Sequence, residues 1–113
     1  MAKTLFEKII DREIPGAFVH EDEHCVAIKD INPAAPTHVL VIPRKPIPRL
    51  VDAKPEDQAL LGHLMLVAGR IAEQTGNGEA FRVVVNNGAG VGQSVFHLHL
   101  HVLGGRAMKW PPG

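Results

Sequence analysis

Histidine and apolar residues alternate near the end of the sequence, in the run His97-Leu98-His99-Leu100-His101-Val102. A period of two is the side-chain period of a β-strand, so the three imidazoles are expected on one face and the apolar side chains on the other. Such a strand needs a helix or a second layer to cover its apolar face. The run therefore predicts a strand from about Ser94 to Leu103, within a sheet that has one face in the core and the other at a site.

The rest of the chain divides into short elements. Thr4 is expected to begin a small helix, because its hydroxyl can cap the first turn and Glu7 follows three residues later, as in a capping box. Further strands are expected at 17–20, 25–29, 38–42 and 81–85, and an amphipathic helix from Pro55 to about Thr75. Gly62 and Gly69 in that helix are expected to mark close packing against the sheet. The pattern predicts one α+β domain over residues 1–113, a mostly antiparallel five-stranded meander with one long helix and one short helix.

Composition excludes several functional classes. Twelve Lys and Arg balance twelve Asp and Glu, and a net charge of zero argues against nonspecific binding of nucleic acid or a membrane surface. The longest apolar run, residues 64–68, is too short to cross a bilayer. A single cysteine, Cys25, and a start without a signal peptide's apolar core favour the cytoplasm.

Three interpretations of the histidine face are open from the residues alone. The histidines could be solvated or structural, or they could bind a metal together with His38 and Cys25, since imidazole and thiolate are common zinc ligands. No acidic residue lies near them, although metal hydrolases usually keep a carboxylate. A neutral imidazole is also a nucleophile at neutral pH, and neighbouring imidazoles can donate hydrogen bonds to phosphoryl oxygens.

The loop before these histidines favours the nucleophilic interpretation. Residues 88–94 contain glycine at three alternate positions, so the backbone could approach a ligand closely and turn N–H groups toward an anion. Gln93 and Ser94 add side-chain donors. The spacing is not the dinucleotide fingerprint, and no helix follows it. A glycine loop beside three imidazoles predicts a phosphate ester or phosphoramidate as the substrate.

These residues resemble the histidine triad superfamily of nucleotide hydrolases and transferases. The resemblance is carried by Asn86-x-Gly88-x-x-x-Gly92-Gln93-x-Val95-x-His97-x-His99-x-His101, and by Asp30-Ile31-x-Pro33-x-Ala35-Pro36-x-His38. The ending Trp110-Pro111-Pro112-Gly113 resembles the Hint branch, the purine nucleoside phosphoramidases. The similarity covers essentially the whole chain.

The resemblance implies a mechanism. His99 would be the nucleophile that attacks the α-phosphorus of a purine nucleoside 5'-phosphoramidate, or of an acyl-adenylate, and forms a covalent nucleotidyl-histidine. His101 would contact a phosphoryl oxygen and His97 would organise the loop. His38 would hydrogen-bond the other ring nitrogen of the nucleophile, and Ser94 would assist the departing amine.

The resemblance also implies where the nucleotide, AMP or GMP, would bind. Asp30 would accept hydrogen bonds from both ribose hydroxyls, and Asn86, Gly92 and Gln93 would hold ribose and phosphate. The apolar slot for the purine would consist of Phe6, Ile9, Ile31 and Leu40. Relatives of this kind form homodimers that continue one sheet across the interface, with the Trp110 segment reaching toward the partner's site.

The resemblance leaves two alternatives and one expectation about metals. The alternatives are a dinucleoside polyphosphate hydrolase or nucleotidyltransferase, and a regulatory module that binds nucleotide without turnover; transferases usually carry Gln at the position of His101. Some bacterial relatives bind zinc through a cysteine pair with histidines, whereas this chain has only Cys25. We therefore expect neither a required cofactor nor a tight structural zinc site. His20, His24 and His63 are expected to need no role beyond solvation.

Overall fold

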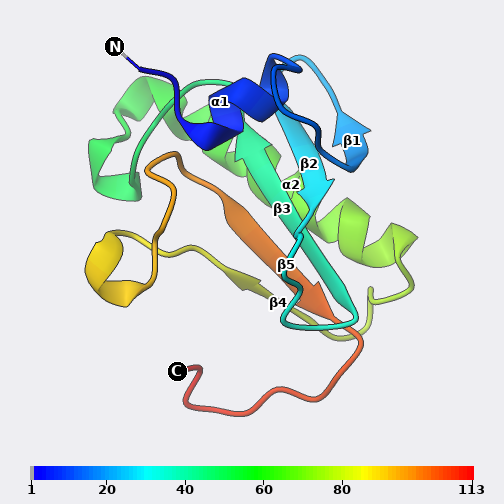
Figure 1. Ribbon diagram of the computed structural model, residues 1–113. Coiled ribbons are helices and arrows are strands. Elements are labelled where there is room, and N and C mark those ends of the chain that lie inside the picture. The colour runs from blue at the N-terminus through cyan, green and yellow to red at the C-terminus, as the bar shows by residue number, and fades with distance from the viewer. Residues whose placement is uncertain (1) are drawn as a thin grey trace.

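The computed structural model describes residues 2–113 and contains one five-stranded sheet with helices on both faces (Figure 1). In chain order the helices and strands are α1 (Leu5–Ile10), β1 (Phe18–Glu21), β2 (Cys25–Lys29), β3 (Thr37–Pro43), α2 (Gln58–Gln74), β4 (Phe81–Val84) and β5 (Leu100–Gly104). Single 3₁₀ turns lie at Leu50–Asp52, Pro55–Asp57 and Ala89–Val91. The predicted α+β class is confirmed, and so is the capping box of Thr4 and Glu7 at the start of α1.

All neighbouring strands are antiparallel, in the order β1-β2-β3-β5-β4. This order departs from the expected meander at one place, because β5 lies between β3 and β4. The chain crosses from β3 to the far edge through α2 and returns to fill the gap. Every residue of β3 after Thr37 is buried, as its β-branched, apolar sequence predicts for a central strand.

The two faces of the sheet carry separate apolar clusters. The cluster on the α2 face contains Val39 and Val41 of β3 together with Leu98, Leu100 and Val102, packed against Leu64, Val67, Ala68 and Ile71 of α2. The cluster on the α1 face contains Phe6, Ile9, Val26, Ile28, Leu40 and Ile42. In Figure 1, α2 runs behind the sheet and α1 lies in front of it near β2 and β3. The apolar residues of the histidine run therefore face α2, as predicted, and the imidazoles lie on the α1 face.

The strand that carries the histidines is shorter than predicted. It begins at Leu100 instead of Ser94, so His97 and His99 precede the ladder and only His101 lies within it. Its partner β3 ends at Pro43, and a proline has no N–H to extend the pairing. The segment is held instead by Leu98, whose N–H donates to the carbonyl of Ile47 at 2.7 Å.

The interpretation of the helix glycines is wrong. A Cβ atom built at Gly62 or Gly69 would meet nothing within 4 Å. The packed side of α2 is formed by other residues, and both glycines lie away from the sheet near Met65 and Leu66, which are 57% and 62% exposed. Within residues 2–113, no helix has the length and apolar character that a bilayer span requires.

Candidate active site

His97 is fully buried, and both its ring nitrogens are hydrogen-bonded. Nε2 lies 2.7 Å from the carbonyl oxygen of Pro43, and Nδ1 lies 3.0 Å from the hydroxyl of Thr4. Because a carbonyl only accepts, Nε2 carries the proton, and Nδ1 accepts from the Thr4 hydroxyl. That hydroxyl also accepts the N–H of Glu7 at the start of α1. His97 therefore holds its segment to β3 and α1 through these two hydrogen bonds.

His99 has one ring nitrogen fixed and the other available. Nδ1 donates to the carbonyl of His97 at 2.8 Å, which assigns the ring proton to Nδ1 and a lone pair to Nε2. No hydrogen bond within the described chain occupies this Nε2. The edge of the Phe6 ring packs on the imidazole at a centroid distance of 4.8 Å and an angle of 82°. The ring is thus held in one tautomer and one orientation, with an unprotonated nitrogen free to react.

His38 hydrogen-bonds His101 and not the predicted nucleophile. Its Nδ1 accepts the backbone N–H of Ala34 at 2.9 Å, and its Nε2 lies 2.8 Å from Nδ1 of His101. The expected bond to His99 does not form, because the carbonyl of His97 already occupies that nitrogen. His101 pairs with Leu40, two residues after His38, so the two imidazoles are diagonal neighbours on one face of β3 and β5.

These contacts set the protonation of both rings. Since Nδ1 of His38 accepts, its proton lies on Nε2 and is donated toward His101, which leaves the proton of His101 on its own Nε2. That Nε2 is buried and has no hydrogen-bond partner within the described residues. An orphaned buried donor is costly, so its presence here indicates a place for a ligand oxygen.

Burial favours the neutral form of His97, His99 and His101. Burial lowers the pKa of His97 and of His99 below the ordinary 6.5. Burial, followed by the neighbouring His99 and His38, lowers the pKa of His101 to about 4. At neutral pH, His99 therefore has its lone pair available for attack.

Asp30 directly follows the last residue of β2 and lies beside His38. Its Oδ1 accepts the N–H of Asn32 at 2.8 Å, and its Oδ2 lies 3.3 Å from Nε2 of His38. The carboxylate is partly exposed, so it remains accessible to a ribose. Asp30, His38 and His101 also each offer one ligand atom, all within 4.8 Å of one another, and they are the residues of this site that could hold a metal ion.

The glycine loop is built differently from the expectation. Gln93 is buried, and its amide is used inside the protein: Oε1 accepts from Gly88 N–H at 2.7 Å, and Nε2 donates to the carbonyls of Pro48 and Val95. It braces the loop and leaves no side-chain donor free for phosphate. Gly88 and Gly92 have φ of +101°, which explains the need for glycine there. Asn86 is partly exposed and Ser94 is exposed.

Several backbone N–H groups of the glycine loop already donate hydrogen bonds inside the loop. Those of Val91, Gly92 and Gln93 donate to carbonyls within the loop. The predicted anion cradle is therefore not formed by these three groups.

The residues proposed for the purine slot are not all brought together. Phe6, Ile9 and Leu40 belong to the α1-face cluster, with exposed fractions of 4%, 7% and 7%. Ile31 lies outside that cluster and is 91% exposed, because it follows β2 in a turn. The Phe6 ring packs edge-on against the imidazoles of His97 and His99.

Two contributions were missed by the sequence reasoning. Thr4 was assigned only to helix capping, and nothing local in the sequence indicates its contact with His97, ninety-three residues away. The group that orients His38 is the backbone N–H of Ala34. Every residue except proline has such a group, so the residue type at this position does not indicate the contact.

The fold and site define a class of α+β proteins in which buried, neutral imidazoles gather on one face of an antiparallel sheet. The model of the HIT domain family matches residues 11–108, and this chain belongs to that family. An uncharacterized HIT-like protein of Synechocystis sp. is 64% identical over 110 residues, which cover 97% of this chain and 96% of the relative.

Solved structures support the same assignment. A HIT family hydrolase from Legionella pneumophila is 46% identical, with a TM-score of 0.95 over 98% of this chain and all of that one. A histidine triad nucleotide-binding protein from Candida albicans is 27% identical, with a TM-score of 0.83 over 98% of this chain and 85% of that one. The family and its fold are consistent with a nucleotide-binding hydrolase.

Proposed function

We propose that this protein hydrolyses purine nucleoside 5'-phosphoramidates through a covalent nucleotidyl-histidine, as in the Hint branch of its family. The observation that carries the proposal is the fixed tautomer of His99, whose Nδ1–H is bound to the His97 carbonyl while Nε2 keeps its lone pair. Nε2 attacks the α-phosphorus, a P–N bond to His99 forms, and the P–N bond to the amine breaks. Water then cleaves the nucleotidyl-histidine and releases the nucleoside monophosphate.

The neighbouring groups have distinct roles in this mechanism. The buried Nε2–H of His101 donates to a phosphoryl oxygen, where negative charge is greatest in the transition state. His38 keeps the proton of His101 on that nitrogen. The amine takes a proton from water as it leaves, with a hydrogen bond from the Ser94 hydroxyl, and Asp30 binds the ribose hydroxyls. None of these steps needs a metal ion.

A substrate panel tests the reaction. Adenosine and guanosine 5'-phosphoramidates with varied amines are compared with an acyl-adenylate and with a diadenosine polyphosphate, at equal concentration and after exhaustive chelation. We expect the amides to be hydrolysed fastest, with activity unchanged by the chelator. Faster cleavage of the polyphosphate would favour the other hydrolase branch of the family. Loss of activity in chelator, with an unchanged circular dichroism spectrum and thermal midpoint, would contradict metal-free catalysis.

Single-turnover trapping separates an enzyme from a regulatory binding module. Acid quenching of a radiolabelled phosphoramidate reaction is expected to leave label on a peptide that contains His99. A protein that binds AMP tightly but never becomes labelled would be a nucleotide-binding module without turnover.

We also propose that the protein is a homodimer joined through α2 and the β4 edge. Met65 and Leu66 are exposed on the side of α2 opposite the sheet, beside the open glycines Gly62 and Gly69. Phe81 on the edge strand β4 is 39% exposed. Exposed apolar residues on a helix and on an adjoining unpaired strand edge are typical of an interface that continues a sheet into a second copy.

The C-terminal segment lies next to the same edge. Arg82 of β4 donates to the carbonyl of Lys109 at 3.0 Å, and the following Trp110 is 81% exposed. In a dimer formed at this edge, we expect Trp110 to extend toward the partner's site.

A further inference from the structure

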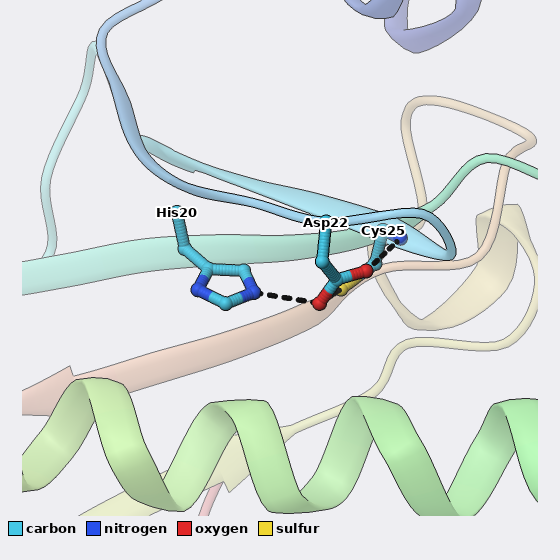
Figure 2. A group of neighbouring side chains, drawn as sticks. All are labelled: His20, Asp22 and Cys25. Carbon is cyan, nitrogen blue, oxygen red and sulfur yellow. Dashed lines mark hydrogen bonds and ion pairs between the residues drawn. The ribbon is translucent and has the colours of Figure 1, made fainter.

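A second group of ligand-type side chains lies on the α2 face, away from the histidine triad. We call it the Asp22 cluster, and it consists of His20, Asp22, Cys25 and His63. These residues come from the end of β1, the following turn, the start of β2 and the middle of α2. Figure 2 shows the first three, with the His20 and Asp22 side chains directed toward α2.

One carboxylate oxygen is the centre of this cluster. Oδ2 of Asp22 lies 2.7 Å from Nε2 of His20 and 2.7 Å from Nε2 of His63, and it accepts from the Cys25 thiol at 3.5 Å. The other oxygen, Oδ1, is fixed by the backbone N–H groups of His24 and Cys25 at 2.7 and 2.9 Å. The turn thus holds the carboxylate in place and aims its free oxygen at two imidazoles and a thiol.

An irregularity in β1 brings His20 to this face. Phe18 pairs with Ile28 and packs on the α1 face, so a regular strand would place His20 on that face as well. The pairing shifts between Phe18 and His20, and His20 pairs with Ala27, whose side chain is in the α2-face cluster. Bulges often re-aim a side chain at functional positions.

We propose that the Asp22 cluster is a binding site for one zinc ion. Two imidazoles, a thiolate and a carboxylate form a four-ligand set of the nitrogen, sulfur and oxygen type that zinc accepts in tetrahedral sites. The ligand atoms of His20, Asp22 and Cys25 lie within 4.8 Å of one another. His63 is not in that group of three but reaches the same Asp22 oxygen at 2.7 Å. A tetrahedral zinc with bonds of about 2.0–2.3 Å needs ligand atoms about 3.3–3.8 Å apart, so zinc binding requires the side chains to rotate around the ion.

Charge and protons balance at such a site. Zinc carries two positive charges, and the Asp22 carboxylate and the Cys25 thiolate carry two negative ones. Binding releases the thiol proton to water, and the proton on Nε2 of each histidine is carried on Nδ1 instead. The nearby guanidinium of Arg44 is paired with Glu21, and its Nε donates to the backbone carbonyl of Asp22.

Zinc binding would change the protonation of the Cys25 thiol. Burial raises the pKa of Cys25 to about 12, with the charge of Asp22 adding to the effect. A coordinated thiol is deprotonated by the metal, so the ion replaces an inert buried thiol with a bound thiolate. The expectation of no structural zinc site considered only paired cysteines, whereas folding brings His63 of α2 to a hairpin turn that already holds the cysteine.

The role of the ion is structural. All four ligands come from the protein, so no position remains open for substrate, and the triad lies on the opposite face of the sheet. The ion ties the β1–β2 hairpin to α2. The proposal is independent of the reaction assigned to His99.

Cobalt(II) substitution tests the site with an optical signal from one residue. Cys25 is the only cysteine in the sequence, so a sulfur-to-cobalt charge-transfer band can arise only there. Titrating the reduced full-length protein is expected to give this band together with the visible d–d bands of a tetrahedral site, saturating at one equivalent per chain. Zinc is expected to displace cobalt and remove both signals.

Variants assign the remaining ligands. His20→Gln and His63→Gln are each expected to weaken zinc binding by more than about 100-fold, because even outer partners of metal ligands often contribute 10–100-fold. His24→Gln is the matched control: its ring packs on His63 at 5.3 Å but is not a ligand, and affinity should stay within about threefold of wild type. Cys25→Ser should abolish the charge-transfer band. Circular dichroism of each metal-free variant checks folding, and His20→Gln, which changes a half-buried side chain, keeps the test available if Cys25→Ser misfolds.

Three results would overturn the proposal. The first is no binding of zinc or cobalt, which would leave the cluster as a hydrogen-bond network centred on a carboxylate. The second is binding without the charge-transfer band. The third is binding that His101→Gln abolishes and Cys25→Ser leaves intact, which would place the metal at Asp30, His38 and His101.

Discussion

Nε2 of His38 lies 2.8 Å from Nδ1 of His101, and the backbone N–H of Ala34 fixes the other side of the His38 ring. This chain of contacts starts at a backbone group, which cannot change protonation, and ends at the buried Nε2–H of His101. The order of donors therefore determines which nitrogen of His101 carries the proton. The backbone N–H of Ala34, four residues before His38, thus determines the position of the ring proton of His101 on β5.

The contact between these two histidines predicts the behaviour of a His38→Gln variant. Without His38, the proton of His101 is free to move to Nδ1, and the donor to the phosphoryl oxygen is lost. We expect kcat on adenosine 5'-phosphoramidate to fall about 100-fold, with KM changed much less. Steady-state kinetics check this, and an unchanged kcat would remove His38 from the mechanism.

Substitution of His99 by Ala is expected to reduce turnover by at least about 1000-fold, because no other imidazole in the site has an unprotonated, accessible nitrogen. AMP binding by calorimetry and the thermal midpoint should remain close to wild type. His24→Gln, at an exposed position, is the matched control with normal activity. Hydrolysis by the Ala variant at the wild-type rate would exclude His99 as the nucleophile.

Acidification is expected to destabilise the fold before carboxylates protonate. The pKa of His101 is about 4 in the folded protein and 6.5 when unperturbed, and the pKa values of His97 and His99 are lowered as well. The unfolded chain therefore binds more protons, so the free energy of unfolding is at its full value above about pH 6.5 and decreases as the pH falls toward 4. Urea unfolding at about pH 7.5 and about pH 5 measures this.

A non-titrating variant isolates the contribution of one histidine. His101→Gln should flatten part of the pH dependence between these two conditions. A stability that stays constant or rises on acidification would contradict the buried, neutral histidines.

Removal of the Thr4 hydroxyl is expected to affect two elements at once. It caps α1 and donates to His97, so Thr4→Ala should lower the free energy of unfolding by about 1–3 kcal/mol. Thr4→Ser keeps the hydroxyl and should cost about 0.5 kcal/mol or less. Equal stability of the Ala and Ser variants would show that neither hydrogen bond matters.

The proposed dimer is tested at the exposed side of α2. Leu66→Glu places a charge among exposed apolar residues and is expected to give monomers in sedimentation velocity, without unfolding α2 because the side chain is 62% exposed. Glu73→Gln on the same helix is the control. A wild-type protein that sediments as a monomer at micromolar concentration would exclude the interface.

Local patterns in the sequence were sufficient to predict most of the fold. The period of two in the histidine run, the spacing of apolar residues in α2 and the capping box of Thr4 each depend on neighbours in the chain, and the elements form close to the predicted positions. The bounds of β5 were wrong because its length depends on Pro43 in another strand. The position of β5 between β3 and β4 also depends on pairing between distant segments.

The candidate site was predictable in its residue types but not in its contacts. The sequence indicated four histidines of the site, His38, His97, His99 and His101. The bond from His38 to His99 was implied by the family resemblance, and neither the resemblance nor the spacing reveals that a carbonyl two residues away already occupies Nδ1 of the His99 ring. Gln93 was expected to offer its side-chain donor to the ligand. That donor is bound instead by the backbone carbonyls of Pro48 and Val95, and the spacing of residues cannot reveal such partners. His63 was expected to be solvated, but its Nε2 lies 2.7 Å from Oδ2 of Asp22. The two residues are far apart in the sequence and meet only when the chain folds.

The shift in pairing between Phe18 and His20 reverses which face of the sheet the even-numbered residues of β1 occupy. Before the shift, even-numbered residues belong to the layer of α1, and after it they belong to the layer of α2. A relative that lacks one residue in this strand could keep His, Asp and Cys in the same order and still place its histidine in the opposite layer. Residue identity in this hairpin is therefore informative only together with the number of residues between Phe18 and Cys25.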